Sequence, residues 1–244
     1  MDTSTDGPVS ARARSAHKQD PAGVWAPLSG LADAAAQAAS TGSVAISRGF
    51  DRTSRVRGKA LRDLLVERGV SAVEITPALG SERLLAGCEV AAVVNLVGDG
   101  SWQPHRLAAK LRAPLFVPGE RTATLAGESE RDVIGVTAAS SGERDVALTR
   151  LAVLAETTDG KLEVTRNGET VTIEGGRVEV TLHEGSLDVH LNGVGVEETF
   201  AATEIGISTA GTPHRFIRDE LPIADFEGAL TVATEPVGLR VRAA

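Results

Sequence analysis

The feature of this sequence that most constrains its fold is the alternation of short apolar runs with helical segments in its first half. The apolar runs lie at residues 43–49, 70–77, 88–98 and 114–119. The run at 88–98, "CEVAAVVNLVG", is apolar on both faces that a strand would present. Strands buried on both faces are typical of parallel sheets that helices cover on each side. We therefore predict an N-terminal α/β domain built on a parallel sheet.

The second half has a different pattern, in which strand-like runs follow one another closely and the helical signal fades. Residues 161–193 alternate apolar and polar positions and are interrupted by turn pairs, as hairpins require. These pairs are Asn167-Gly168, Gly175-Gly176, Glu184-Gly185 and Asn192-Gly193. The final run, "GALTVATEPVGLRVRAA", reads as two strands around Pro236. We predict an antiparallel β-sandwich domain after the α/β domain.

These patterns divide the chain into four predicted parts. They are a flexible tail at 1–22, a short helix at 23–43, a nucleotide-binding-like α/β domain at 44–127 and a β-sandwich domain at 128–244. The tail has almost nothing to bury, so it cannot offset the entropy of becoming ordered. The helix carries one apolar stripe, which predicts that it docks on the core or on a partner; its members are Leu28, Leu31, Ala35 and Ala38.

Composition excludes several classes of protein. The chain has 244 residues, 42% of them apolar, and a formal net charge of −8, which argues against a general attraction to nucleic acid. The single cysteine, Cys88, enters the apolar run at 88–98 and is expected to be a small core residue. With one cysteine no internal disulfide can form, so a cytoplasmic protein is expected. No run approaches the ~20 apolar residues of a membrane span, so no integral membrane segment is expected.

The stretch "VNLVGDGSW" at residues 94–102 ends the most apolar run and is the leading candidate for a ligand site. Ligands of open parallel sheets bind outside the carboxyl ends of the strands. Gly98 and Gly100 allow the backbone to approach a phosphate closely, and Ser101 can cap the following helix. Asp99 would hold Mg²⁺ or orient an attacking hydroxyl. A plain connecting turn fits the same residues, because Asp-Gly is a common turn pair.

A basic cluster follows the first predicted strand at the same edge of the sheet. Its members are Arg48, Arg52, Arg55, Arg57 and Lys59. Arginine side chains bind phosphate oxygens in pairs, and Arg55 and Arg57 are the candidates for such a clamp. Thr53 or Ser54 is expected to cap the helix. A solvated start of a helix is the alternative interpretation.

Other catalytic patterns are weak. The five histidines form no i, i+3 or i+4 pair on a predicted helix, and the chain has no Gly-x-Ser-x-Gly sequence, so zinc chemistry and a serine hydrolase are not expected. His105 is either a phosphate contact or a surface residue. The polar loop at 208–220 lies either beside the ligand cleft or in solvent.

The stretch "AAVVNLVGDGSW" at 91–102 resembles the glycine-rich signature of the diacylglycerol kinase and NAD kinase superfamily, in which a buried strand runs into Gly-Gly-Asp-Gly-Thr. Val97 stands at the first glycine and Ser101 at the threonine. "LRAPLFVPGERTATLAG" at 111–127 lies where those kinases have Pro-Leu-Gly-Thr-Gly-Asn, and Pro118 and Gly119 match it. "PIADFEGALTVATEPVGLRV" near the C-terminus is similar to the ending of the lipid kinases, with Asp225 and Glu227 at its acidic positions.

The resemblance implies a phosphotransferase that moves phosphate from ATP, with Mg²⁺, to a hydroxyl of a small molecule or lipid. It implies that a nucleotide binds between the two domains, that Asp99 is catalytic, and that Asp225 and Glu227 bind the metal. The implied phosphate-binding residues are Gly98, Gly100, Ser101, Gly119 and Thr122, with Arg55 and Arg57 from the basic cluster. Relatives of this kind often pair through their β domains, so a homodimer is also implied.

The sequence departs from the family's motifs in each of the three stretches. Val97 replaces a glycine in the first, and Phe226 stands at a glycine in the last. In the second loop Glu120, Arg121 and Thr122 replace the family's residues, and Glu120 adds negative charge. The alternative is therefore a catalytically silent relative that keeps the fold as a ligand-binding or interaction module.

Overall fold

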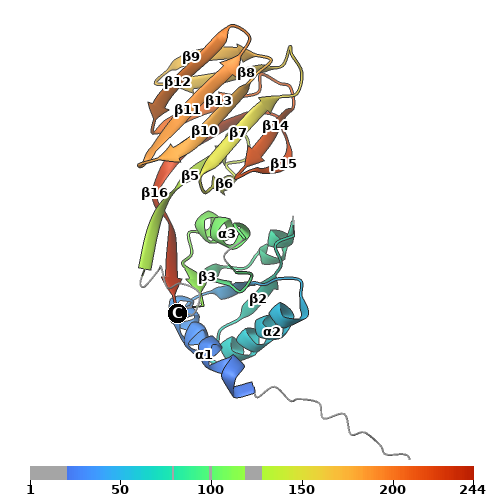
Figure 1. Ribbon diagram of the computed structural model, residues 1–244, viewed down its shortest axis with the longest axis vertical. Coiled ribbons are helices and arrows are strands. Elements are labelled where there is room, and N and C mark those ends of the chain that lie inside the picture. The colour runs from blue at the N-terminus through green and yellow to red at the C-terminus, as the bar shows by residue number, and fades with distance from the viewer. Residues whose placement is uncertain (1–20, 79, 99–100, 119–127) are drawn as a thin grey trace, which may run out of the picture.

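The computed structural model of the chain describes residues 21–78, 80–98, 101–118 and 128–244. A parallel sheet with helices is followed by an antiparallel sandwich of two sheets, which confirms the predicted fold class (Figure 1). Of the predicted tail, residues 1–20 lie outside the described residues, and residues 21–22 belong to the first helix. No helix among the described residues is both long and apolar enough to cross a bilayer.

The parallel sheet forms from the apolar runs of the first half. Its strands are β1 (Ser43–Ser47), β2 (Ala72–Ile75), β3 (Val90–Asn95) and β4 (Leu115–Val117), in the order β2-β1-β3-β4. Every neighbouring pair is parallel. The central strands β1 and β3 are buried almost throughout, as expected for strands covered on both faces.

Helices cover both faces of this sheet. The helices α1 (Pro21–Ala38) and α2 (Arg52–Glu67) pack on one face, while η1 (Ser81–Leu85) and α3 (Gln103–Leu111) pack on the other. The apolar stripe of α1 docks on the core, where Leu28 and Leu31 are fully buried. The helix α3 lies between the sheet and the sandwich (Figure 1).

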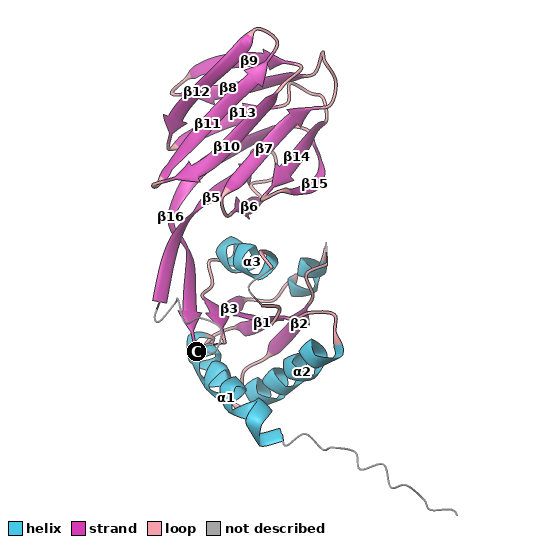
Figure 2. Cartoon of the chain, in the orientation of Figure 1, coloured by secondary structure: helices cyan, strands magenta, loops and turns pink. Residues whose placement is uncertain are grey.

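In the described residues after β4 the chain forms twelve strands; Figure 2 draws strands in magenta. They are β5 (Glu128–Ala138), β6 (Arg144–Ala147), β7 (Arg150–Ala155), β8 (Lys161–Arg166), β9 (Glu169–Glu174), β10 (Arg177–His183), β11 (Ser186–Gly193), β12 (Val196–Ala202), β13 (Glu204–Ser208), β14 (His214–Arg218), β15 (Leu221–Phe226) and β16 (Ala229–Ala243). One sheet of the sandwich has the order β12-β11-β10-β7-β14-β15. The facing sheet contains β16, β13, β8 and β9, with β5 paired to β16 and β6 paired to β5. Aliphatic side chains from both sheets form the core between them.

The turn pairs behave in two ways. Asn167-Gly168 and Glu184-Gly185 form two-residue hairpin turns with positive φ at both positions, as predicted. The other two predicted hairpin turns are wrong. Gly175-Gly176 connects β9 to β10, which belong to different sheets. Asn192-Gly193 is still paired in β11, and the turn falls two residues later, at Val194-Gly195.

The last strand joins the two parts of the molecule. The first half of β16 pairs with β13 and β5 in the sandwich, whereas its end pairs in parallel with β4, where Val241 lies opposite Leu115. The ladder with β5 is irregular between Glu235 and Leu239, around Pro236. The two strand-like runs predicted around Pro236 are therefore one strand with an interruption, and its end lies in the sheet of the first domain.

Cys88 does not occupy the core position expected for it. The strand β3 begins at Val90, two residues after Cys88, and the thiol is exposed. The apolar run predicted as a strand starts earlier than the hydrogen-bonded ladder, because residues 86–87 form the turn after η1 and residues 88–89 precede the strand.

Candidate functional site

The candidate site begins at the carboxyl ends of the two central strands. Ser47 ends β1 and Asn95 ends β3, and the two residues lie opposite each other in the ladder. The chain connects β1 to β2 on one side and β3 to β4 on the other, so the strand order reverses between β1 and β3. Open α/β sheets bind ligands in the crevice at such a switch point.

Asn95 shapes the loop that follows β3. Its Oδ1 accepts hydrogen bonds from the backbone N–H of Val97 at 2.9 Å and of Gly98 at 3.3 Å. Gly98 has a φ of 105°, which L-residues rarely adopt. The backbone N–H of Ser101 reaches the carbonyl of Gly98 at 3.4 Å. The loop is thus a folded turn whose first half is set by a buried side chain.

A second buried contact positions the helix after this loop. The hydroxyl of Ser47 donates to Oε1 of Gln103, the first residue of α3, at 3.0 Å. Gln103 is only 9% exposed, and its Nε2 has no hydrogen-bond partner among the described residues. The strand β1 therefore fixes the N-terminus of α3 beside the turn. The sequence interpretation missed Ser47, Asn95 and Gln103, although a polar residue at the end of an apolar strand is a usable signal.

One member of the basic cluster forms an ion pair, whereas the two arginines predicted as a phosphate clamp do not. Nε of Arg48 lies 2.6 Å from a carboxylate oxygen of Glu74 on β2, so Arg48 forms a part-buried ion pair. Arg55 is exposed and Arg57 half-buried in the first two turns of α2. Neither forms an ion pair with the described residues.

The cap of α2 differs from the expectation. Asp51 caps the helix by accepting from the backbone N–H of Ser54 at 2.8 Å. Hydrogen bonds from the Ser54 hydroxyl and amide hold the pKa of Asp51 below its usual value. Thr53 and Ser54 were expected to cap, but the helix starts at Arg52, which places them inside its first turn.

A pocket of about 220 Å³ lies beside the turn, between α3 and the sandwich. It is lined by Ser101, Trp102, His105, Arg131, Asp132, Val133, Leu148, Thr149 and Leu239. Nδ1 of His105 lies 3.2 Å from the carbonyl oxygen of Ser101, and Asp132 accepts from the N–H of Val237 at 3.0 Å. Ser101 belongs both to the turn after β3 and to the wall of this pocket.

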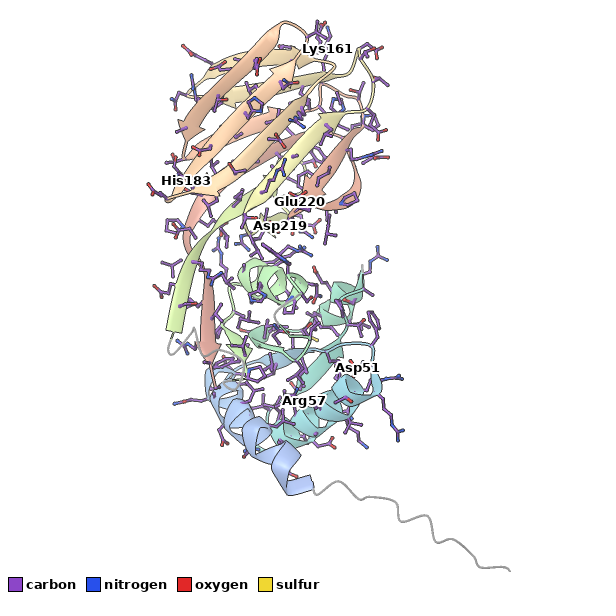
Figure 3. All side chains as sticks on the ribbon, viewed as in Figure 1. Asp51, Arg57, Lys161, His183, Asp219 and Glu220 are labelled. Atoms are coloured by element: carbon purple, nitrogen blue, oxygen red, sulfur yellow. The ribbon has the colours of Figure 1, made fainter. Side chains whose placement is uncertain are left out.

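The structure does not bring the predicted metal ligands to this pocket. Asp225 is exposed on β15 and pairs across the ladder with Arg215, and Glu227 is exposed just after the strand. Figure 3 shows Asp219 and Glu220, which precede β15, on the side of the sandwich that faces α3. Asp225 lies near the other end of β15, about 13 Å from Leu221, the first residue of the strand.

The part of the chain that the structure describes contains no cluster of metal-binding side chains. Within the described ranges no group of three or more His, Cys, Asp or Glu side chains could hold a metal ion. Four other predicted site residues, Asp99, Gly100, Gly119 and Thr122, lie outside the described residues.

Comparisons with known proteins give a distant likeness. No family model matches the chain, and no curated protein matches its sequence. The structure of yeast NADH kinase complexed with NADH is 11% identical, covers 83% of each chain and has a TM-score of 0.45. That of 2,5-dihydroxypyridine dioxygenase from Pseudomonas putida KT2440 is 10% identical, covers 84% of this chain and 90% of that chain, and has a TM-score of 0.28. The assignment of the fold rests on the strand order and pairing described above.

Proposed function

We propose that the chain binds a nucleotide at the carboxyl edge of its parallel sheet and transfers phosphate from ATP to a hydroxyl acceptor. The observation that supports this most is the position of Ser101. It follows the turn at the switch point of the sheet and also lines the interdomain pocket. A ligand with phosphates on the turn could therefore place its remaining part in the pocket.

The phosphates would be held mainly by backbone groups and arginines. The first N–H groups of α3 are not used within the helix, and the helix dipole favours negative charge there. The positive φ of Gly98 lets the preceding backbone turn toward such an anion. We assign Ser101, Gly100 and the guanidinium groups of Arg55 and Arg57 to the same phosphates, with Gly119 and Thr122 on the neighbouring loop.

Asp99 is the residue we assign to the chemical step. Its carboxylate would accept the proton of the acceptor hydroxyl while that oxygen attacks the terminal phosphorus of ATP and ADP leaves. A bound metal ion would neutralise charge on the phosphates.

The positions of Asp225, Glu227 and Arg48 favour a second candidate, a catalytically silent nucleotide-binding module. Asp225 and Glu227 are remote from the pocket, and Arg48 is committed to Glu74. Such a protein would keep the phosphate-binding turn without transferring phosphate.

Thermal unfolding with added nucleotide tests the binding that both candidates share. Wild-type protein is melted with ATP, ADP or NAD, each with and without Mg²⁺. A ligand at 100 times its dissociation constant stabilises the folded state by about 2.7 kcal/mol, which raises the melting temperature by about 5–11 °C for a chain of this size. No shift with any nucleotide would contradict nucleotide binding.

Asp99→Asn separates the enzyme from the silent module. We expect this variant to bind ATP as wild type does but to lose phosphate transfer, measured as ADP release in the presence of candidate alcohols. Asp63→Asn is the matched control, because it removes the same charge from an exposed position on α2. If wild type and Asp99→Asn release ADP at the same rate, Asp99 has no catalytic role.

A further inference from the structure

The contact between α3 and the sandwich contains a buried charge pair. Arg106, in the middle of α3, is 7% exposed. Its Nη1 lies 3.6 Å from Oδ2 of Asp219, whose side chain is 1% exposed. Figure 3 shows Asp219 between the sandwich and α3. This ion pair joins the α/β domain to the β14–β15 turn.

Asp219 also organises the sandwich side of the junction. Its carboxylate accepts from the backbone N–H groups of Leu148 at 2.9 Å and Thr149 at 3.0 Å, and more weakly from Arg150 at 3.4 Å. These residues form the end of the turn between β6 and β7 and the start of β7. One carboxylate therefore holds both this turn and the arginine of α3.

The groups held by this carboxylate belong to two segments that line the pocket or adjoin its lining. Ser101, Trp102 and His105 form one wall, at α3, and His105 is the neighbour of Arg106 in the chain. Leu148 and Thr149 form a second wall, at the turn between β6 and β7, and their amides are bound by Asp219. The Arg106–Asp219 pair thus connects the two walls at residues next to the pocket lining.

The charged groups around the Arg106–Asp219 pair allow its contact to open. Arg218 pairs with Asp145, so two arginines and two aspartates lie close together. Burial, followed by repulsion from Arg218, lowers the pKa of Arg106. Nη1 of Arg106 and Nε of Arg218 have no hydrogen-bond partner among the described residues. Breaking the Arg106–Asp219 contact therefore costs no direct hydrogen bond at Nη1, whereas the amide bonds to Asp219 would remain.

We propose that Arg106 and Asp219 are positioning residues that set the separation of the two walls of the interdomain pocket. The identity of the ligand rests on the proposed function, but the geometry of the pocket does not. Loss of the pair lets the wall at α3 shift relative to the turn between β6 and β7. If the share of molecules with the two walls in place falls to about a tenth, the apparent dissociation constant for ATP rises about tenfold.

Trp102 reports on the pocket without any ligand. It lines the pocket and is 49% exposed, and the chain has two tryptophans, so a Trp25→Phe background leaves Trp102 as the single emitter. In this background the test compares Arg106→Met, Asp219→Asn, their double variant and Glu220→Gln. Methionine keeps much of the arginine volume and leaves the amide bonds of Asp219 in place. Asparagine tolerates the φ of 46° at position 219.

Glu220→Gln is the matched control. It removes a negative charge at the next residue, where the side chain is 75% exposed and pairs with Arg150. We expect unchanged Trp102 quenching by acrylamide in this variant. Arg106→Met and Asp219→Asn should both raise the quenching constant and weaken ATP binding, and the double variant should resemble Arg106→Met, because both changes open one contact.

The results separate three possible roles of the residues at this junction. Unchanged quenching and unchanged ATP affinity in Arg106→Met overturn the proposal. Should Asp219→Asn unfold, Arg106→Met decides alone, and its normal behaviour would make Asp219 an anchor of the turn only. If quenching rises in Arg106→Met while wild type binds no nucleotide, the positioning role stands and the proposed function fails.

Discussion

Single polar residues at the ends of apolar strands set the geometry of the candidate site. Asn95 accepts two backbone N–H groups of the loop after β3, and Ser47 holds Gln103 at the start of α3. An aliphatic residue would extend the apolar strands equally well but could not hold the loop. These residues are almost fully buried, so their hydrogen bonds do not compete with water.

Gly98 carries the backbone conformation on which this loop depends. We expect Gly98→Ala to lower the free energy of unfolding by about 1–3 kcal/mol, because a side chain at a φ of 105° is strained. Urea denaturation followed by circular dichroism measures this. Gly30→Ala is the control, since Gly30 lies within α1 with open space around it, and a helical alanine should stabilise by about 0.5–1 kcal/mol. Equal stability of Gly98→Ala and wild type would show that the turn can rearrange.

Among the helices, α3 connects the α/β domain to the sandwich. Its middle is tied to the sandwich through Arg106, and its last turn is bound by Arg144 of β6. Nη1 of Arg144 donates to the carbonyls of Ala109 at 3.0 Å and Lys110 at 2.6 Å. The other side of the same guanidinium pairs with Glu235 of β16. Arg144 thereby satisfies carbonyls that a helix end leaves free.

The Arg144–Glu235 pair gives a prediction about pH. Hydrogen bonding to Arg144 holds the pKa of Glu235 below its usual value. A carboxylate with a lowered folded pKa stabilises the protein above its unfolded pKa, about 4.3, and this contribution is lost as pH falls through the folded value. Glu235→Gln should therefore be less stable than wild type at pH 7, and the difference should shrink below about pH 4.

Thermal melts of both proteins from pH 3 to pH 7 measure this difference. Glu197→Gln serves as the control, because Glu197 is exposed on β12 and forms no ion pair with the described residues. A difference between wild type and Glu235→Gln that stays constant with pH would contradict an ionic contribution.

At the scale of the whole molecule, β16 makes the two domains one sheet system. Its 15 residues pair with β13 and β5 in the sandwich and with β4 in the parallel sheet. Leu239 and Val241 are buried in the same apolar cluster as Leu107 of α3 and Val133 of β5. Separating the domains would therefore break backbone ladders and expose apolar surface.

We expect a single cooperative unfolding transition in calorimetry, with equal calorimetric and van 't Hoff enthalpies. Val241→Asp places a charge at a position that is 4% exposed and should lower the midpoint of that one transition. Asp on the exposed neighbour, Arg240→Asp, is the control. Two resolved transitions in the wild-type protein would show that the domains unfold independently.

Local patterns explain which parts of the fold could be predicted. Periodicity reveals the apolar strands, and backbone preference reveals the hairpin turns at Asn167-Gly168 and Glu184-Gly185. Both are local properties, so the sequence predicts these elements. Gly175-Gly176 has the same chemistry but crosses between two sheets, because strand pairing depends on partners far along the chain. Cys88 was placed in the core because an apolar run does not show where a ladder begins.

The sequence by itself determined the class of the fold and the position of the glycine turn after β3, because side-chain periodicity and glycine are local properties. Tertiary structure alone decided that Ser101 lines an interdomain pocket, that Asp225 and Glu227 lie away from it, and that β16 returns to the first sheet. It also decided the pairing of Arg106 with Asp219 across 113 positions, since buried charges find partners by proximity in space and not by spacing in the chain.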